Sequence, residues 1–126
     1  MRKVFIFAIL ITLSSNVFAQ ESKILREVAR KYKATPQEVA MLRAIRNAEA
    51  GRPGFELGVE HPKAKGIKRQ YSWALYEIRQ NARRWYALDK KPCFIALLAS
   101  DYCPQNQIVW RENVKRLYLK YTKGGA

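Results

Sequence analysis

The fold is decided by one stretch, residues 35–51, which reads TPQEVAMLRAIRNAEAG. Thr35 is a typical N-cap residue, Pro36 suits the first position of a helix, and Glu38 completes a capping box. Apolar side chains then recur at helical spacing, and the glycine that follows is typical of a helix end. The stretch therefore predicts an amphipathic helix with one face in a core.

Working outward, the same periodicity predicts four more helices: residues 22–33, 70–88, a helix from Pro92, and a helix from about Asn106. Residues 51–69 are different, because they hold four of the six glycines. Within them Phe55, Leu57 and Val59 alternate, which is compatible with a short strand. We expect a mainly α fold, with a loop-rich or short β insertion between the second and third helices.

The N-terminus has the three-part layout of a secretory signal peptide. Arg2 and Lys3 precede an apolar run over residues 4–13, and Val17-Phe18-Ala19 offers small residues at a cleavage site. The run is shorter than the ~20 residues that a transmembrane helix needs. We expect a signal peptide over residues 1–19, a single domain over residues 20–126, and a secreted or periplasmic protein without a transmembrane span.

The chain is strongly basic, with 24 Lys and Arg against 10 Asp and Glu and a formal net charge of +14. Such a field attracts polyanions, although basic residues also serve simply to solvate helix faces. A helix-turn-helix nucleic-acid binder would use the same charge, but the export signal argues against nucleic acid as the partner. We expect peptidoglycan or another anionic glycan as the partner, and a monomer.

The sequence alone does not decide whether the two cysteines form a disulfide. An exported protein can keep a disulfide, but one helix spanning Cys93 to Cys103 would hold the two cysteines too far apart. A metal centre is not expected, because only His61 could join them and no ligand spacing supports it. No cofactor is expected either.

Glu49 is the residue that could carry chemistry. It lies four residues after Ile45 and seven after Leu42, so its carboxyl shares their apolar helix face at the end of the helix. Burial and the negative helix terminus both raise a carboxyl pKa, whereas Arg46 and Arg52 would lower it if they reach it. A protonated carboxyl suits general acid catalysis of glycosidic cleavage. The alternative is a solvent-facing or arginine-paired glutamate.

The sequence around Glu49 resembles a known catalytic segment. Residues 41–59, MLRAIRNAEAGRPGFELGV, are similar to those of the lytic transglycosylase and goose-type lysozyme group of the lysozyme-like superfamily. Residues 94–104, FIALLASDYCP, and 110–114, WRENV, resemble the C-terminal part of its small bacterial and phage members. One departure is Ala50, which stands where the family has a serine after the glutamate.

The resemblance implies a mainly α, lysozyme-like fold and a peptidoglycan-cleaving enzyme with Glu49 as its acid and base. It also implies that Tyr102 lines the cleft. From the residues themselves, Glu56 and Glu60 are candidates for a second carboxylate, against the reading of exposed loop charges. Trp73 lies off the apolar stripe of its helix and is the tryptophan best placed to stack on a sugar. Hydrolase and transglycosylase both stay open, as does a non-enzymatic module that binds the cell wall.

Overall fold

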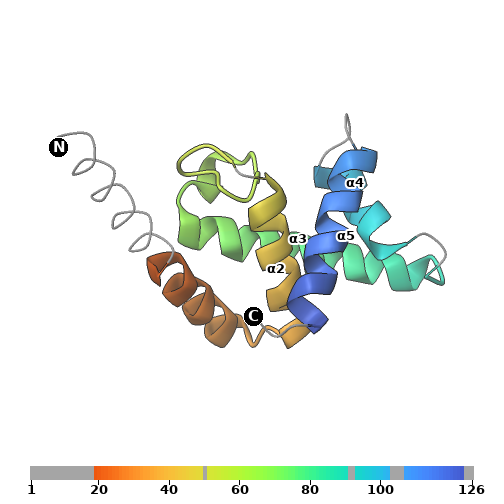
Figure 1. Ribbon diagram of the computed structural model, residues 1–126, viewed down its shortest axis with the longest axis horizontal. Helices are drawn as coiled ribbons and strands as arrows, with labels where there is room; N and C mark the ends of the chain where they lie inside the picture. Colours follow the sequence, from red (N-terminus) through yellow and green to blue (C-terminus); the bar gives the residue numbers. More distant parts are fainter. Residues whose placement is uncertain (1–18, 50, 91–92, 103–106, 124–126) are drawn as a thin grey trace, which may run out of the picture.

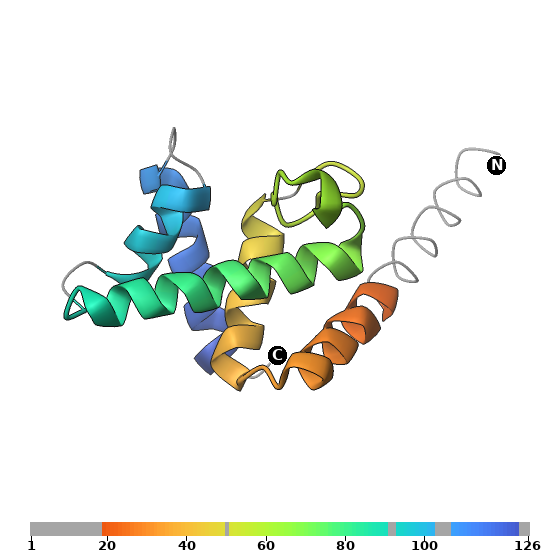
Figure 2. The ribbon, with the colours of Figure 1, turned by 180° about the vertical axis from the view of Figure 1, so that it is seen from behind.

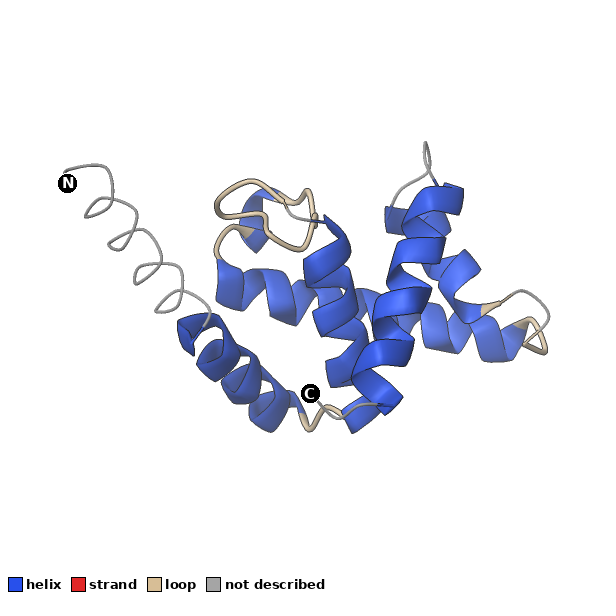
Figure 3. Ribbon diagram, in the orientation of Figure 1, coloured by secondary structure: helices blue, strands red, loops and turns tan. Residues whose placement is uncertain are grey.

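The computed structural model describes residues 19–49, 51–90, 93–102 and 107–123 (Figure 1). In these ranges the chain is mainly α, as expected, and contains no strand (Figure 3). The elements are a helix over residues 19–32, α2 (Pro36–Glu49), the 3-10 helix η1 (Pro62–Ala64), α3 (Ile67–Ala87), α4 (Phe94–Tyr102) and α5 (Gln107–Lys123).

The other elements are arranged around the long helix α3. Figure 2 shows it running across the width of the molecule, with the loop between α2 and α3 above one end and α4 above the other. On its opposite side α2 and α5 lie side by side, and they form the most extensive helix–helix contact in the described chain (Figure 1). The C-terminal end of α2 therefore meets both the loop and α5.

The start of α2 confirms the predicted capping box. The backbone amide of Glu38 donates to Thr35 Oγ1 at 3.1 Å, and the Thr35 amide donates to Glu38 Oε1 at 2.9 Å. Arg79 of α3 also donates from Nε to Glu38 Oε2 at 2.8 Å and from Nη2 to the Tyr32 carbonyl at 2.9 Å. One carboxylate thus caps α2 and, through Arg79, links α3 to the helix over residues 19–32.

The core lies where α2 meets the other elements. Its fully buried side chains come from each element in turn, because each helix turns its apolar stripe inward. They include Val28, Leu42, Ile45, Leu57, Leu75, Leu98 and Val114. Leu57 is the contribution of the loop, and it anchors that irregular segment to the hydrophobic core.

Of the two alternatives expected for residues 51–69, a loop-rich or a short β insertion, the described residues show the loop and no strand. Turn hydrogen bonds take its place, from the Phe55 amide to the Arg52 carbonyl and from the Gly58 amide to the Phe55 carbonyl. Gly54 and Gly58 have φ of +88° and +75°, which interrupts an extended backbone. Of the three alternating apolar residues, only Leu57 is fully buried.

The side chain of Gln70 holds the loop in place. This residue is completely buried in the first turns of α3. Its Oε1 accepts hydrogen bonds from the amides of Leu57 and Val59, and its Nε2 donates to the carbonyls of Val59 and Ala64. The loop has no strand partner, so this one amide side chain satisfies backbone groups that a sheet would otherwise pair.

Several predicted features fall at or beyond the edges of the described chain. α3 begins at Ile67, three residues before the expected start, and α4 begins at Phe94. Residues 1–18 of the predicted signal peptide, Pro92 and Cys103 lie outside the described residues, and Cys93 is exposed. Every helix in the described part of the chain is too short or too polar to cross a lipid bilayer.

Replacing Gln70 tests this account of the loop. Gln70→Leu leaves the buried groups of the loop without partners, so the free energy of unfolding should fall by about 3 kcal/mol or more. Urea denaturation followed by circular dichroism measures the change. Gln37→Ala, in the exposed first turn of α2, should change it by less than about 0.5 kcal/mol. Equal stability of Gln70→Leu and the natural protein would contradict the role given to Gln70.

Candidate active site

Glu49 is the last residue of α2, and its side chain is half-buried. Oε1 of its carboxyl accepts a hydrogen bond of 2.7 Å from the indole Nε1 of Trp110 in α5. Trp110 is itself buried in the core. The end of one helix therefore presents a carboxyl whose orientation is fixed by a rigid side chain of another helix.

Gly58 covers the other side of the same carboxyl. A Cβ at this position would lie 2.6 Å from Oε2 of Glu49 and 2.7 Å from its Cδ, closer than van der Waals contact permits. The φ of +75° also disfavours any residue with a side chain. Only glycine allows the loop backbone to approach the carboxyl this closely.

The pKa of Glu49 is raised above its usual value, as its position in the sequence predicted. Burial is the main cause, the charge of Glu60 adds to it, and the hydrogen bond from Trp110 opposes it. The two arginines that could have lowered it pair with other carboxylates. Arg46 forms an ion pair with Glu21 and Arg52 forms one with Glu60.

Tyr102, at the end of α4, fixes the tryptophan in turn. Its ring stacks on Trp110, with centroids 5.3 Å apart and planes inclined by 17°. Its hydroxyl oxygen is buried and has no hydrogen-bond partner within the described chain. Burial and the charges of Glu77 and Glu49 hold the pKa of this phenol far above its usual value, so the hydroxyl stays protonated.

A cleft of about 500 Å³ opens beside Gly58 and Tyr102, between the loop, α3 and α4. Its lining residues are Gly58, Val59, Glu60, His61, Trp73, Glu77, Ser100, Asp101 and Tyr102. The Glu49 carboxyl packs against Gly58 but is not itself one of the residues that line this cleft. The cleft is large enough for part of an extended ligand rather than for an ion alone.

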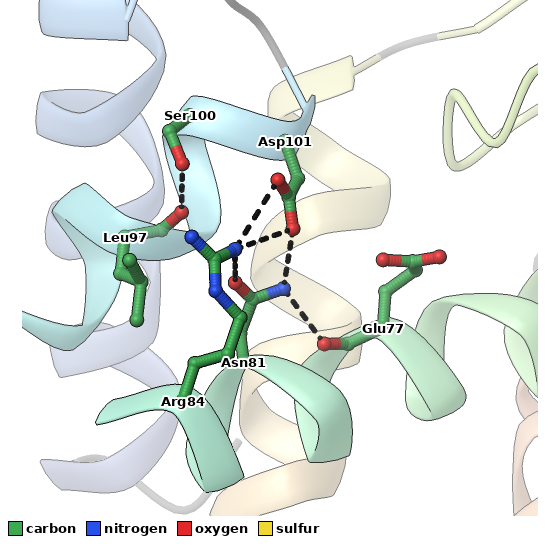
Figure 4. Close-up of polar contacts among 6 residues, drawn as sticks. All are labelled: Glu77, Asn81, Arg84, Leu97, Ser100 and Asp101. Atoms are coloured by element: carbon green, nitrogen blue, oxygen red, sulfur yellow. Dashed lines mark hydrogen bonds and ion pairs between the residues drawn. The ribbon is translucent and has the colours of Figure 1, made fainter. Parts of the chain in front are cut away.

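A polar network joins α3 and α4 beside the cleft, which its member Asp101 lines (Figure 4). Asp101 Oδ2 accepts hydrogen bonds from Asn81 Nδ2 at 2.9 Å and from Arg84 Nη1 at 3.2 Å, and Asn81 is completely buried. Asn81 also donates to the main-chain carbonyl of Glu77, whereas the Glu77 carboxylate stands apart from the network (Figure 4).

The predicted site residues fall in different places. Trp73 lines the cleft. The ring of His61 stacks on Trp73 with the ring centroids 4.4 Å apart, so one face of the indole already has a partner. Glu60 lines the cleft from an exposed position. Glu56 is half-buried inside the loop, where Oε1 accepts a hydrogen bond from the Gly54 amide, and it does not line the cleft.

Glu77 is the residue that sequence reasoning missed. It lines the cleft, and burial together with the charge of Asp101 raises its pKa. A signal was present, because Trp73, Glu77, Asn81 and Arg84 follow one another at steps of four, four and three. That spacing marks a second, polar stripe beside the apolar stripe of α3.

Comparisons with known proteins add no relative: no family model, curated protein or solved structure matches this chain. Among the described residues, no group of three or more His, Cys, Asp and Glu side chains could hold a metal ion. The chemistry of the site must therefore be argued from its own side chains.

The raised pKa of Glu49 implies a stability that depends on pH. The folded pKa lies above the usual value of 4.5, so this carboxyl contributes fully below pH 4.5, and its contribution is lost as pH rises through the folded pKa. Glu49→Gln removes the charge and keeps an acceptor for Trp110. The variant should melt at a higher temperature than the natural protein at pH 7, and the difference should vanish near pH 4. A lower melting temperature of Glu49→Gln at pH 7 would contradict the burial described.

The hydrogen bond from Trp110 can be tested separately. Trp110→Phe keeps an aromatic ring against Tyr102 but removes the donor, and this donor lowers the pKa of Glu49. The variant should therefore raise that pKa further, as measured by NMR titration of ¹³C-labelled glutamate carboxyls. Tyr118→Phe, on the same helix, should leave it unchanged.

Proposed function

We propose that this protein is an exported enzyme that cleaves the glycan strands of peptidoglycan, with Glu49 as general acid and base. One observation carries the proposal: a half-buried carboxyl with a raised pKa is held between Trp110 and Gly58, and Gly58 lines a cleft. A raised pKa favours the protonated form, and that is the form a general acid for glycosidic cleavage needs.

The hydrogen bond from Trp110 decides which oxygen carries the proton. An indole N–H can only donate, so Oε1 must accept in both protonation states of Glu49. The proton of the neutral acid therefore belongs to Oε2, the oxygen next to Gly58, and Gly58 lines the cleft. This arrangement places the acidic proton on the side of the carboxyl that faces Gly58.

Cleavage then needs one carboxyl in two roles. Oε2 gives its proton to the glycosidic oxygen as the bond from that oxygen to the anomeric carbon breaks. A nucleophilic hydroxyl next bonds to the anomeric carbon and returns its proton to Glu49. A water molecule in that role gives hydrolysis, and the C6 hydroxyl of the muramic acid unit itself gives a lytic transglycosylase. The second route requires no further carboxylate, whereas the first could use Glu60, which lines the cleft, but not Glu56, which does not.

The remaining features support a partner outside the cytoplasm. The first 19 residues have the pattern of a signal peptide, and the chain carries a formal net charge of +14. Peptidoglycan and its attached polymers are acidic, so the basic surface would bring the enzyme to its substrate. Trp73 would contribute an apolar surface beside the sugar rings.

The test is digestion of purified peptidoglycan, with products identified by mass spectrometry. The natural protein should release muropeptides, and Glu49→Gln should lower the rate at least about a hundredfold, because a general acid contributes that much or more. Glu112→Gln, an exposed carboxylate on α5, is the matched control and should keep full activity.

The products separate the possible outcomes. Anhydro ends identify a transglycosylase and reducing ends a hydrolase. If the protein sediments with cell walls and releases nothing, it is a binding module and the enzymatic proposal is wrong. Equal activity of Glu49→Gln and the natural protein would remove Glu49 from the mechanism.

A further inference from the structure

The cleft is acidic, although the chain as a whole is strongly basic. Three of its lining residues, Glu60, Glu77 and Asp101, carry carboxylates, and none of the lining residues is lysine or arginine. A fourth carboxyl, that of Glu49, packs against Gly58. In a chain with 24 basic and 10 acidic residues, three of the acidic ones thus line a single hollow. The local field in the cleft opposes the field of the rest of the molecule.

Glu77 differs from the other half-buried carboxylates of the chain. No hydrogen-bond donor within the described residues contacts its two oxygens, although the residue is only half-exposed. The other four each have a donor: Arg46 for Glu21, Arg79 for Glu38, Trp110 for Glu49 and the Gly54 amide for Glu56. Glu77 is thus available to a ligand that enters the cleft.

The hydroxyl of Tyr102 points to a ligand independently. It is buried and has no partner within the described chain, and Tyr102 is one of the residues that line the cleft. The charge of Glu77 acts on this phenol, so the two groups lie near each other. A hydroxyl can both donate and accept, and a ligand with several polar hydrogens would satisfy both residues at once.

We propose that the side of the cleft formed by Glu77 and Tyr102 binds an ammonium group of the substrate. The ammonium belongs either to a glucosamine unit that has lost its acetyl group or to the stem peptide. This inference rests on the proposed function, because it names a group on the glycan that Glu49 would cleave. An ammonium offers three donors, enough for the Glu77 carboxylate, the Tyr102 oxygen and Asp101. An acetylated nitrogen offers one donor and no charge.

Because the protein is basic overall, a preference for a free amine would identify a local acidic site. Non-specific attraction by a molecule of net charge +14 favours anionic ligands and disfavours amines. A gain in affinity from a free amine must therefore come from a local acidic site. Asp101 and Glu60 already have arginine partners, Arg84 and Arg52, which leaves Glu77 as the lining carboxylate without a charge partner in the described chain.

The experiment uses the Glu49→Gln protein, so that ligands bind without being cleaved. Calorimetry compares two pairs of probes: the glucosamine hexamer with the N-acetylglucosamine hexamer, and a muramyl tetrapeptide with its side-chain amine free or acetylated. The free amine should bind about tenfold more tightly in one pair, because a charged hydrogen bond is stronger than a neutral one. The pair that shows the difference identifies the source of the ammonium. Equal affinities within both pairs would overturn the inference.

Two variants in the same background test the residues. Glu77→Gln should abolish the preference for the free amine, and Tyr102→Phe, which removes only the hydroxyl, should reduce it. Glu112→Gln should retain it in full. Thermal melting establishes that each variant is folded, and an undiminished preference in Glu77→Gln would overturn the inference.

The outcomes distinguish this inference from the proposed function. If the natural protein cleaves peptidoglycan but no probe pair shows a preference, the enzymatic proposal stands and the ammonium site is wrong. If the free amine is preferred and no peptidoglycan is cleaved, the ammonium site stands and the enzymatic proposal is wrong.

Discussion

The buried amide of Gln70 is the constraint on which the rest of the site depends. A loop with two glycines at positive φ and no strand partner has little reason to adopt one shape. Four hydrogen bonds from a single side chain provide that reason. They fix Leu57 in the core and thereby place Gly58 against the Glu49 carboxyl. The site is therefore set by α3 as much as by α2.

The helices and the burial of Glu49 could be predicted because both follow from local spacing. The capping box of Thr35 and Glu38 spans four residues. Glu49 lies on the same helix face as Leu42 and Ile45, as its spacing in the sequence indicates. The sequence could not exclude a strand, because the shape of the loop depends on hydrogen bonds to Gln70, which follows the loop in α3. The same alternation of apolar residues is also compatible with a loop in which only one of them, Leu57, enters the core.

The neighbours of the acid were beyond prediction for the same reason. Trp110 was expected in the core, and it lies there, but its hydrogen bond to Glu49 joins residues 61 positions apart. The contact between Gly58 and the carboxyl depends on how the loop folds back, which no local pattern encodes. Glu77 was the exception, since its polar stripe on α3 is visible in the sequence. A polar stripe on a helix, however, is usually only solvated surface.

The distance along the chain between Glu49 and Trp110 has a consequence for how the protein is made. Synthesis proceeds from the N-terminus, so the acid leaves the ribosome long before the tryptophan that orients it. Until α5 emerges and packs on α2, Glu49 lacks the donor that orients its carboxyl. The site is therefore completed only when the last helix of the described chain has been made.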